Sequence, residues 1–150
     1  TGTVVVNNPT ALKDATVTYI LLDGSGNETA DQYTVAATKA NNYQYSILIP
    51  ADKTGNFKIK VTAPGYLAYE KTSVSVTASG SIGPAHDIYP GDTRNFDNEI
   101  NIFDISLIIK NFGSNVAAPY LPCDLNDDTW VNVSDISLLI ENFGRPMTIQ

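Results

Sequence analysis

The chain is poor in the residues on which most catalytic sites and disulfide frameworks depend. Its 150 residues include one cysteine, one histidine, one methionine and one tryptophan. A lone cysteine cannot form a disulfide within the chain, so we expect Cys123 to be a small packed residue, and the cysteine count leaves the redox compartment open. His86 lies between two prolines, and no Ser–His–Asp set can be assembled around it. We therefore expect no enzyme activity.

Long apolar runs and an excess of basic residues are also absent. No stretch of about 18 consecutive apolar residues occurs, so we expect no membrane-spanning helix. Nine Lys and Arg stand against 16 Asp and Glu, for a net charge of −7, and no basic stripe is present that would favour nucleic acid as a partner. No leader peptide is recognisable at Thr1, so we expect a mature or excised piece of a modular, secreted protein.

Negative charge is concentrated in the second part of the chain. Residues 1–90 carry six Lys against seven Asp and Glu (net −1), whereas residues 91–150 carry three Lys and Arg against nine Asp and Glu (net −6). This change, together with the change in pattern, predicts two domains, at 1–88 and 89–150. The junction at 87–90 is too short to be a free linker, so we expect the two domains to pack together.

Oxygen-bearing side chains in the acidic part follow the spacing of a calcium-binding loop. In the segment 124–135, DLNDDTWVNVSD, they occupy positions 1, 3, 5, 9 and 12, and position 7 can supply its backbone carbonyl. Calcium takes about six to eight oxygen ligands of these kinds. The expected ligands of this second loop are Asp124, Asn126, Asp128, Trp130, Asn132 and Asp135.

The same pattern occurs 31 residues earlier. The segments 101–113 (NIFDISLIIKNFG) and 132–144 (NVSDISLLIENFG) match at nine of 13 positions. The repeat predicts a first calcium loop, whose expected ligands are Asp92, Asn95, Asp97, Glu99, Asn101 and Asp104. A strict offset puts Thr93 at position 1. We favour Asp92, with a one-residue insertion, because a carboxylate binds calcium more strongly than a hydroxyl.

Polar turns that only cap two helices are the simpler explanation of these segments. They would account for Asp104 and Asp135, but not for the alternating ligands that precede them. Paired prolines before each loop exclude an entering helix, so each repeat is expected to be a loop followed by a helix. Because the loop carboxylates repel one another, we expect this part to fold as it binds two calcium ions.

Two such loop–helix repeats, of about 22 residues each, resemble a dockerin module, and the resemblance covers residues from about 90 to 146. Dockerins are calcium-folded domains of bacterial cellulosomes that bind cohesin modules on scaffoldin proteins. The resemblance implies a small C-terminal all-α domain with two calcium-binding loop–helix (half EF-hand) repeats. The absence of entering helices argues against a calmodulin-like sensor, whose target groove opens between paired helices.

The first part of the chain alternates short β-branched and aromatic runs with turn residues. Strands are expected at 3–7, 15–22, 32–36, 43–49, 56–63, 67–70 and 72–77. This pattern predicts an N-terminal all-β, antiparallel Ig-like sandwich. The stretch GNFKIKVTAPGYL at 55–67 resembles Ig-like modules of the carboxypeptidase-regulatory and Cna-B type. Such a module directly before a dockerin looks like the X-module–dockerin pair of scaffoldins.

The helices that begin near Asp104 and Asp135 carry apolar residues at spacings of three and four. We expect them to pack antiparallel, to end at Gly113 and Gly144, and to bury an apolar stripe in a shared core. The expected stripe residues are Ile105, Ile108, Ile109, Phe112, Ile136, Leu139, Ile140 and Phe143.

By the dockerin resemblance, the outer helix face and the residues just before loop position 12 contact a cohesin. The implied contacts are Ile102, Phe103, Ser106, Leu107, Lys110, Asn111, Ser114, Val133, Ser134, Ser137, Leu138, Glu141, Asn142 and Arg145. Burial under a partner would explain an exposed Phe103, and packing against the sandwich is the alternative. The near-twofold repeat would allow two binding orientations, which the Phe103/Ser134 and Lys110/Glu141 differences would make unequal.

The expected function is non-catalytic, calcium-dependent anchoring through a cohesin on a scaffoldin or a cell-surface anchoring protein. Such a module would be secreted and would act at the bacterial cell surface, with polysaccharide only an indirect partner. Two alternatives remain open. One is a carbohydrate-binding sandwich that uses exposed tyrosines, and the other is a calcium-triggered switch.

Overall fold

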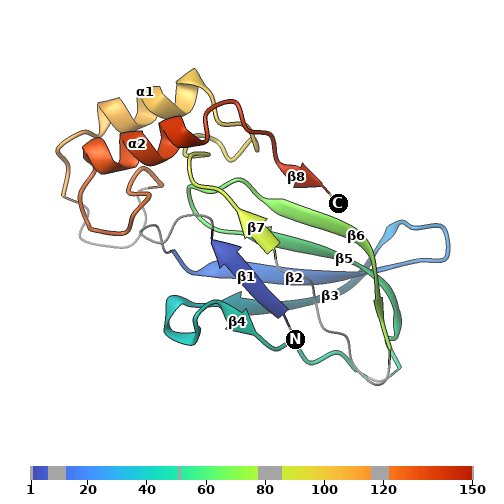
Figure 1. Ribbon diagram of the computed structural model, residues 1–150. Coiled ribbons are helices and arrows are strands. Elements are labelled where there is room, and N and C mark those ends of the chain that lie inside the picture. The colour runs from blue at the N-terminus through green and yellow to red at the C-terminus, as the bar shows by residue number, and fades with distance from the viewer. Residues whose placement is uncertain (1, 7–12, 51, 78–85, 116–121, 150) are drawn as a thin grey trace.

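The computed structural model describes residues 2–6, 13–50, 52–77, 86–115 and 122–149. This part of the chain is mostly β structure, with two sheets and a pair of short helices at one end of them (Figure 1). The C-terminal segment leaves the helices and returns to the edge of the larger sheet. The chain therefore passes between the β and helical portions twice, before the first helix and after the second.

The larger sheet has five strands in the order β3-β2-β5-β6-β8. Its members are β2 (Ala15–Leu22), β3 (Glu28–Ala37), β5 (Gly55–Thr62), β6 (Tyr69–Val76) and β8 (Thr148–Ile149). The first four are antiparallel neighbours, and β8 pairs parallel with β6. The predicted strand at 15–22 is confirmed. The prediction of two strands at 67–70 and 72–77 is wrong, because β6 is one continuous strand. It contains an irregularity, where the register shifts and Ser73 adopts a positive φ of 59°.

The smaller sheet has three strands in the order β4-β1-β7. Here β1 (Gly2–Val6) pairs antiparallel with β4 (Gln44–Tyr45) and parallel with β7 (His86–Ile88). The strand expected at 43–49 is reduced to two residues, because Asn42 and Tyr43 have positive φ angles after the short 3-10 helix Lys39–Asn41. The β structure had been expected to be wholly antiparallel, and the two parallel pairs, β1 with β7 and β6 with β8, show that this prediction is wrong.

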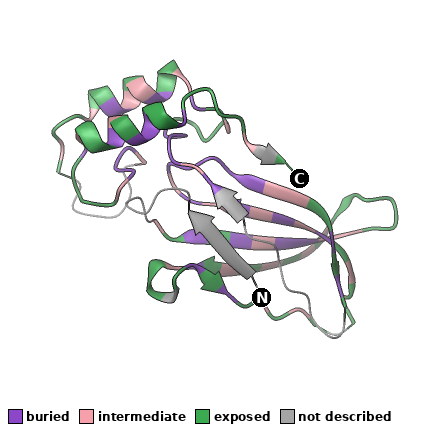
Figure 2. Ribbon diagram, viewed as in Figure 1, coloured by how far each residue is buried: buried purple, intermediate pink, exposed green. Residues whose placement is uncertain are grey.

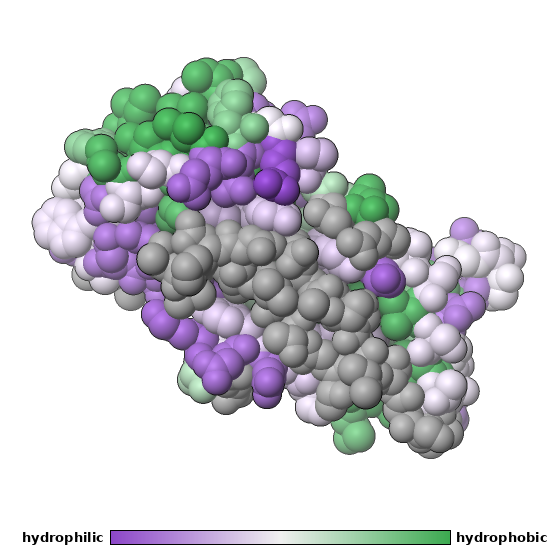
Figure 3. Space-filling model, in the orientation of Figure 1, coloured by the Kyte–Doolittle hydropathy of each residue, from purple (hydrophilic) through white to green (hydrophobic). Residues whose placement is uncertain are grey.

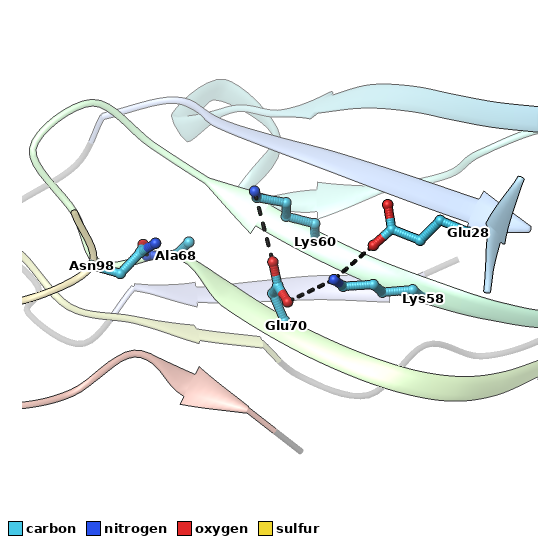
Figure 4. Close-up of polar contacts among 6 residues, drawn as sticks. All are labelled: Glu28, Lys58, Lys60, Ala68, Glu70 and Asn98. Carbon is cyan, nitrogen blue, oxygen red and sulfur yellow. Dashed lines mark hydrogen bonds and ion pairs between the residues drawn. The ribbon is translucent and has the colours of Figure 1, made fainter. Parts of the chain in front are cut away.

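Alternating side chains on the central strands create the core. Phe57, Ile59 and Val61 of β5 are fully buried, and Figure 2 shows buried residues along β2, β5 and β6. The intervening β5 residues Lys58 and Lys60 form ion pairs with Glu70 on the neighbouring strand β6, and Lys58 also pairs with Glu28 on β3, as Figure 4 shows. The period of two in the sequence therefore divides an apolar interior from a charged outer surface.

The two helices are α1 (Ile102–Lys110) and α2 (Val133–Glu141), which lie side by side. The N–H of Gly113, after α1, donates to the carbonyl of Val131 before α2 at 2.8 Å, and Gly144 donates to Ile100 at 2.9 Å. The end of each helix is thus bonded to the start of the other, so the pair is antiparallel and the two repeats are related by a near-twofold axis. Each helix has nine residues, and none in the described chain is long and apolar enough to cross a membrane.

The expected apolar stripe is only partly buried. Ile108 and Leu139 are fully buried, but the predictions for four residues are wrong, since their side chains are more than half exposed: Ile109, Phe112, Ile140 and Phe143. The closing carboxylates Asp104 and Asp135 are themselves buried, and they fix the rotation of their helices. Ile108 and Leu139, four positions after these carboxylates, therefore face inward. Ile109 and Ile140, five positions after them, lie about 140° around the helix and face outward.

Candidate metal loops and helix surface

Backbone amides and polar side chains give the second loop, 124–135, a closed shape. The Asp124 carboxylate accepts hydrogen bonds from the N–H groups of Asp128 at 3.1 Å and Thr129 at 3.0 Å. The side-chain amide of Asn126 lies 2.8 Å from Asp128 Oδ2, and that of Asn132 lies 3.3 Å from the same oxygen. The residues at positions 3, 5 and 9 are therefore gathered together, while position 1 holds the backbone turn.

The last residue of each loop also begins a helix. Asp135 accepts from the N–H of Leu125 at 2.6 Å and of Asn132 at 2.8 Å, and the Asn132 side chain accepts from Ser134 N–H at 2.7 Å. Asn132 and Asp135 thus form a capping box, and Asn101 and Asp104 form the same arrangement in the first loop. These carboxylates hold the start of the loop against the start of the helix.

In the first loop, Asp92 takes the place that Asp124 has in the second. Asp92 Oδ2 accepts from the Asn98 N–H at 3.0 Å, which parallels the bond from Thr129 to Asp124. Thr93 instead donates its N–H to Asp104 Oδ1 at 2.8 Å, as Leu125 does to Asp135. The geometry therefore places Asp92 at position 1 and Thr93 at position 2.

The first loop is one residue longer than the second, and the extra residue lies at Asn95. Arg94 donates its N–H to Asp104 as Asn126 does to Asp135, and Asn95 follows with a positive φ of 63°. Asn95 is exposed, and within the described loops no side-chain bond joins it to Asp97 like the one between Asn126 and Asp128. By backbone position Arg94 corresponds to Asn126, although the sequence offset pairs Asn126 with Asn95.

The chemistry of the first loop fits a cation. Asp92 is fully buried, and among the described residues its Oδ1 atom has no hydrogen-bond partner. Burial, with the charges of Asp104 and Asp97 nearby, raises the pKa of Asp92 to about 7. A divalent ion would satisfy the free oxygen and favour the ionised carboxylate.

A metal ion bound in these loops would need oxygen ligands of several chemical kinds. In the described part of the chain, no three His, Cys, Asp or Glu side chains form a cluster that could hold a metal by themselves. A calcium ion also takes amide and backbone carbonyl oxygens, so Asn side chains and main-chain groups would complete its shell. Several of the expected ligands are exposed at the loop surface: Asn95, Asp97, Glu99, Asp128 and Trp130. Asn101, Asn126 and Asn132 are half-buried.

Apolar side chains cover the outer face of the helix pair, where Figure 3 shows hydrophobic residues gathered over α1 and α2. We call this set the helix surface: Ile102, Phe103, Ile109, Phe112, Val133, Ile140 and Phe143, each more than half exposed. The polar residues expected to contact a partner are also exposed, namely Ser106, Lys110, Ser134, Ser137, Glu141 and Arg145. Leu107, Asn111 and Ser114 are half-buried.

Two expected contact residues do not belong to this surface. Leu138 and Asn142 are buried, so their predicted exposure to a partner is wrong. The Asn142 side chain donates to the carbonyl of Leu138 at 2.9 Å and so caps the last turn of α2 from inside. The rotation of each helix instead turns outward the four residues that had been expected in the core: Ile109, Phe112, Ile140 and Phe143.

Phe103 is not buried by the β structure. Its side chain is 58% exposed, and the Arg94 guanidinium lies 5.1 Å from the centre of its ring. The alternative that the sandwich buries Phe103 is therefore wrong. The repeat has Ser134 at the matching position, so one end of the helix surface carries an aromatic ring and the other a small hydroxyl group.

A turn between β5 and β6 joins the β structure to both loops. The Tyr66 hydroxyl donates to the Leu125 carbonyl of the second loop at 3.0 Å. The Ala68 N–H donates to the Asn98 side chain of the first loop at 3.2 Å (Figure 4). On the other side, the Arg145 guanidinium lies 3.9 Å from the centre of the Tyr89 ring. The strands expected at 56–63 and 67–70 leave this turn between them, but the sequence did not predict its role as a support for the loops, because the partners are distant in the sequence.

The fold of these elements, a sandwich-like β structure with two short helices, is similar to that of a chain in cohesin-X-dockerin complexes. One similar structure is an N-terminal interface mutant of a type II cohesin-X-dockerin complex from Acetivibrio cellulolyticus, with 23% identity, a TM-score of 0.62, and coverage of 97% of this chain and 92% of that chain. A C-terminal interface mutant of the same type of complex, also from Acetivibrio cellulolyticus, has 23% identity, a TM-score of 0.65, and coverage of 97% and 94%. No family model matches the chain, and no curated protein matches its sequence.

Proposed function

We propose that this chain is a non-catalytic, calcium-dependent anchoring module that binds a cohesin and attaches a scaffoldin to a cellulosome or to a cell-surface anchoring protein. One observation carries the proposal. Two loop–helix units, related by a near-twofold axis and bonded end to end, present exposed apolar side chains on one face. In this interpretation residues 1–88 are the X-module-like part and residues 89–150 are the dockerin.

The loops supply the calcium dependence of the proposed function. Asp92 and Asp124 at the start of each loop, with Asp104 and Asp135 at its end, are buried carboxylates close to one another within each loop. Calcium bound there would compensate their charge and add no reactive chemistry. The Asn and Asp side chains between them would complete each site, and the ordered loops would then hold α1 and α2 in position.

The helix surface supplies the partner. Apolar side chains on adjacent helices are unusual at a solvent-facing position, and burial under a second protein would remove them from water. Seven large apolar residues project there, with charged groups at the edge, which is the composition of a protein interface with an apolar centre and a polar rim. Such a module would act outside the cell, where calcium is abundant.

A carbohydrate-binding function is less well supported. It requires a row of exposed aromatic rings on the β structure. Of the six tyrosines in residues 1–88, Tyr33 is half-buried and the other five are buried: Tyr19, Tyr43, Tyr45, Tyr66 and Tyr69. Binding to soluble or insoluble glucans, measured by affinity electrophoresis, would favour this second function over protein anchoring.

Removal of calcium is expected to abolish binding to a cohesin. The full chain should bind at least one member of a cohesin panel in calcium and lose detectable binding in EDTA, because the loops that position the helices then lose their ion. Surface plasmon resonance on immobilised cohesins measures this, and re-addition of calcium should restore binding. Binding that is equal in calcium and EDTA, or the absence of binding to every cohesin, would contradict the proposal.

The substitution Phe103→Ala is expected to weaken cohesin binding about 10- to 100-fold, since a large aromatic ring at an interface contributes this much when it is central. Leu48→Ala is the matched control, because Leu48 is 91% exposed on the β portion, away from the helix surface. Both variants should unfold at the wild-type temperature. If Phe103→Ala and Leu48→Ala bind equally well, the helix surface is not the cohesin site.

A further inference from the structure

Arg94 lies against Phe103 at the start of α1, at one end of the helix surface. The central carbon of its guanidinium is 5.1 Å from the centre of the exposed ring, within the range of a cation–π interaction. The backbone of each residue is held by the loop that caps α1. The Arg94 N–H donates to Asp104 Oδ1 at 2.8 Å, and the Phe103 N–H donates to Asn101 Oδ1 at 2.9 Å. The pair is therefore built on a bonded frame rather than on a free chain end.

The start of α2 has the same frame but a different pair of side chains. The N–H of Asn126 donates to Asp135, as that of Arg94 does to Asp104, and the N–H of Ser134 donates to the capping residue Asn132 at 2.7 Å. The matching positions thus carry a neutral amide and a small hydroxyl in place of a cation and a ring. The near-twofold symmetry of the helix surface is broken at this feature.

The Arg94 charge is exposed and has no carboxylate partner among the described residues. The ion pairs of the described chain all lie on the β structure, where they involve Lys53, Lys58 and Lys60. The Phe103 ring attracts the guanidinium but offers it no oxygen acceptor, so its five N–H donors remain available. Their planar arrangement matches a carboxylate, which can accept two parallel hydrogen bonds from it.

We propose that Arg94 and Phe103 act as one recognition unit, which takes a carboxylate side chain of the partner next to an apolar contact. The inference rests on the proposed function, because the partner is the cohesin that docks on the helix surface. Phe103 fills an apolar part of the cohesin and holds the guanidinium in position, and Arg94 binds an Asp or Glu beside it. Because the matching end of the surface has neither group, the unit also determines which end of the helix pair meets that carboxylate.

The test uses the full chain in calcium and the cohesin of the panel that binds it, with affinity measured by surface plasmon resonance. Arg94→Gln should weaken binding about tenfold, and Arg94→Glu about 100-fold, because it sets a negative charge against the partner's carboxylate. Arg94→Lys should fall between wild type and Arg94→Gln, since an ammonium keeps the charge but not the planar pair of donors. Lys39→Gln, which removes an exposed cation of the β portion, is the control and should bind as the wild type does. Each Arg94 variant keeps the N–H that bonds to Asp104, so all should unfold at the wild-type temperature.

Two further measurements test the unit and its partner. Arg94→Gln combined with Phe103→Ala should weaken binding by less than the product of the two single losses, because each residue acts through the other. Each Asp and Glu of the cohesin is then changed singly to Lys and measured against Arg94→Glu. One of these changes should restore binding about tenfold or more, and it should weaken binding to the wild-type chain.

The outcomes separate this inference from the proposed function. If the wild type binds a cohesin and Arg94→Gln binds it as Lys39→Gln does, the recognition unit is overturned and the anchoring proposal stands. The unit is also overturned if the single losses multiply fully, or if no cohesin carboxylate restores binding to Arg94→Glu. If the wild type binds no cohesin, both the inference and the proposed function fail.

Discussion

Gly65→Ala is expected to lower the free energy of unfolding by about 2–5 kcal/mol. An alanine disfavours the backbone conformation of this position, and there is no space for its Cβ atom. Gly65 has a φ of +81°, which costs an alanine about 1–2 kcal/mol. A Cβ atom there would meet the backbone carbonyl oxygen of Pro122 and lie 2.9 Å from Leu125 Cδ2. Forcing an extra carbon into such a packed place adds about 1–3 kcal/mol.

Urea unfolding in calcium buffer measures this effect. Gly24→Ala is the control, since Gly24 has no atom within 4 Å of the added carbon and lies in the exposed turn between β2 and β3. The chemical-shift changes caused by Gly65→Ala should extend to Leu125 and its neighbours in the second loop. A loss no larger than that of Gly24→Ala would show that the turn does not press against this loop.

Asp135→Ala is expected to lower the free energy of unfolding by about 3–5 kcal/mol. Its buried carboxylate accepts from three backbone amides, those of Leu125, Asn126 and Asn132. Each buried N–H that loses its partner costs about 1–3 kcal/mol, part of which water recovers when the loop opens. The loss of a negative charge at the N-terminus of α2 adds a smaller term.

The control for this variant is Asp127→Ala, because Asp127 is an exposed carboxylate of the same loop. Thermal unfolding followed by circular dichroism, in calcium and in EDTA, compares the two. Asp135→Asn should fall between wild type and Asp135→Ala, since the amide oxygen can still accept from the backbone. Equal stability of the Asp127 and Asp135 variants would mean that the closing carboxylate does not hold the loop.

The sequence predicted best what is encoded locally. The sequence placed the helix starts near Asp104 and Asp135, and α1 and α2 begin two residues earlier, after the capping residues Asn101 and Asn132. The glycines at 113 and 144, which marked the helix ends, adopt positive φ angles. The strand 15–22 was equally clear from its composition. Each of these signals acts over a few residues, so a single sequence is sufficient to read it.

Features that depend on distant contacts were predicted less well. The rotation of the helices follows from the burial of Asp104 and Asp135 beneath the loops, and helical periodicity alone selected a stripe that is half exposed. The strand β8 is only two residues long and gains its conformation from pairing with β6. The role of Tyr66 depends on Leu125, 59 positions away. No local pattern records such pairings.

The exchange of backbone bonds between Gly113 and Val131, and between Gly144 and Ile100, has a consequence for how the repeated unit could have arisen. Each copy completes the other, so one loop and helix, excised alone, would expose Ile108 or Leu139 and leave its terminal amide unbonded. A solitary ancestral copy would have had to associate with a second identical chain before the duplication fused the two. The present tandem arrangement has the symmetry expected of such a fused homodimer.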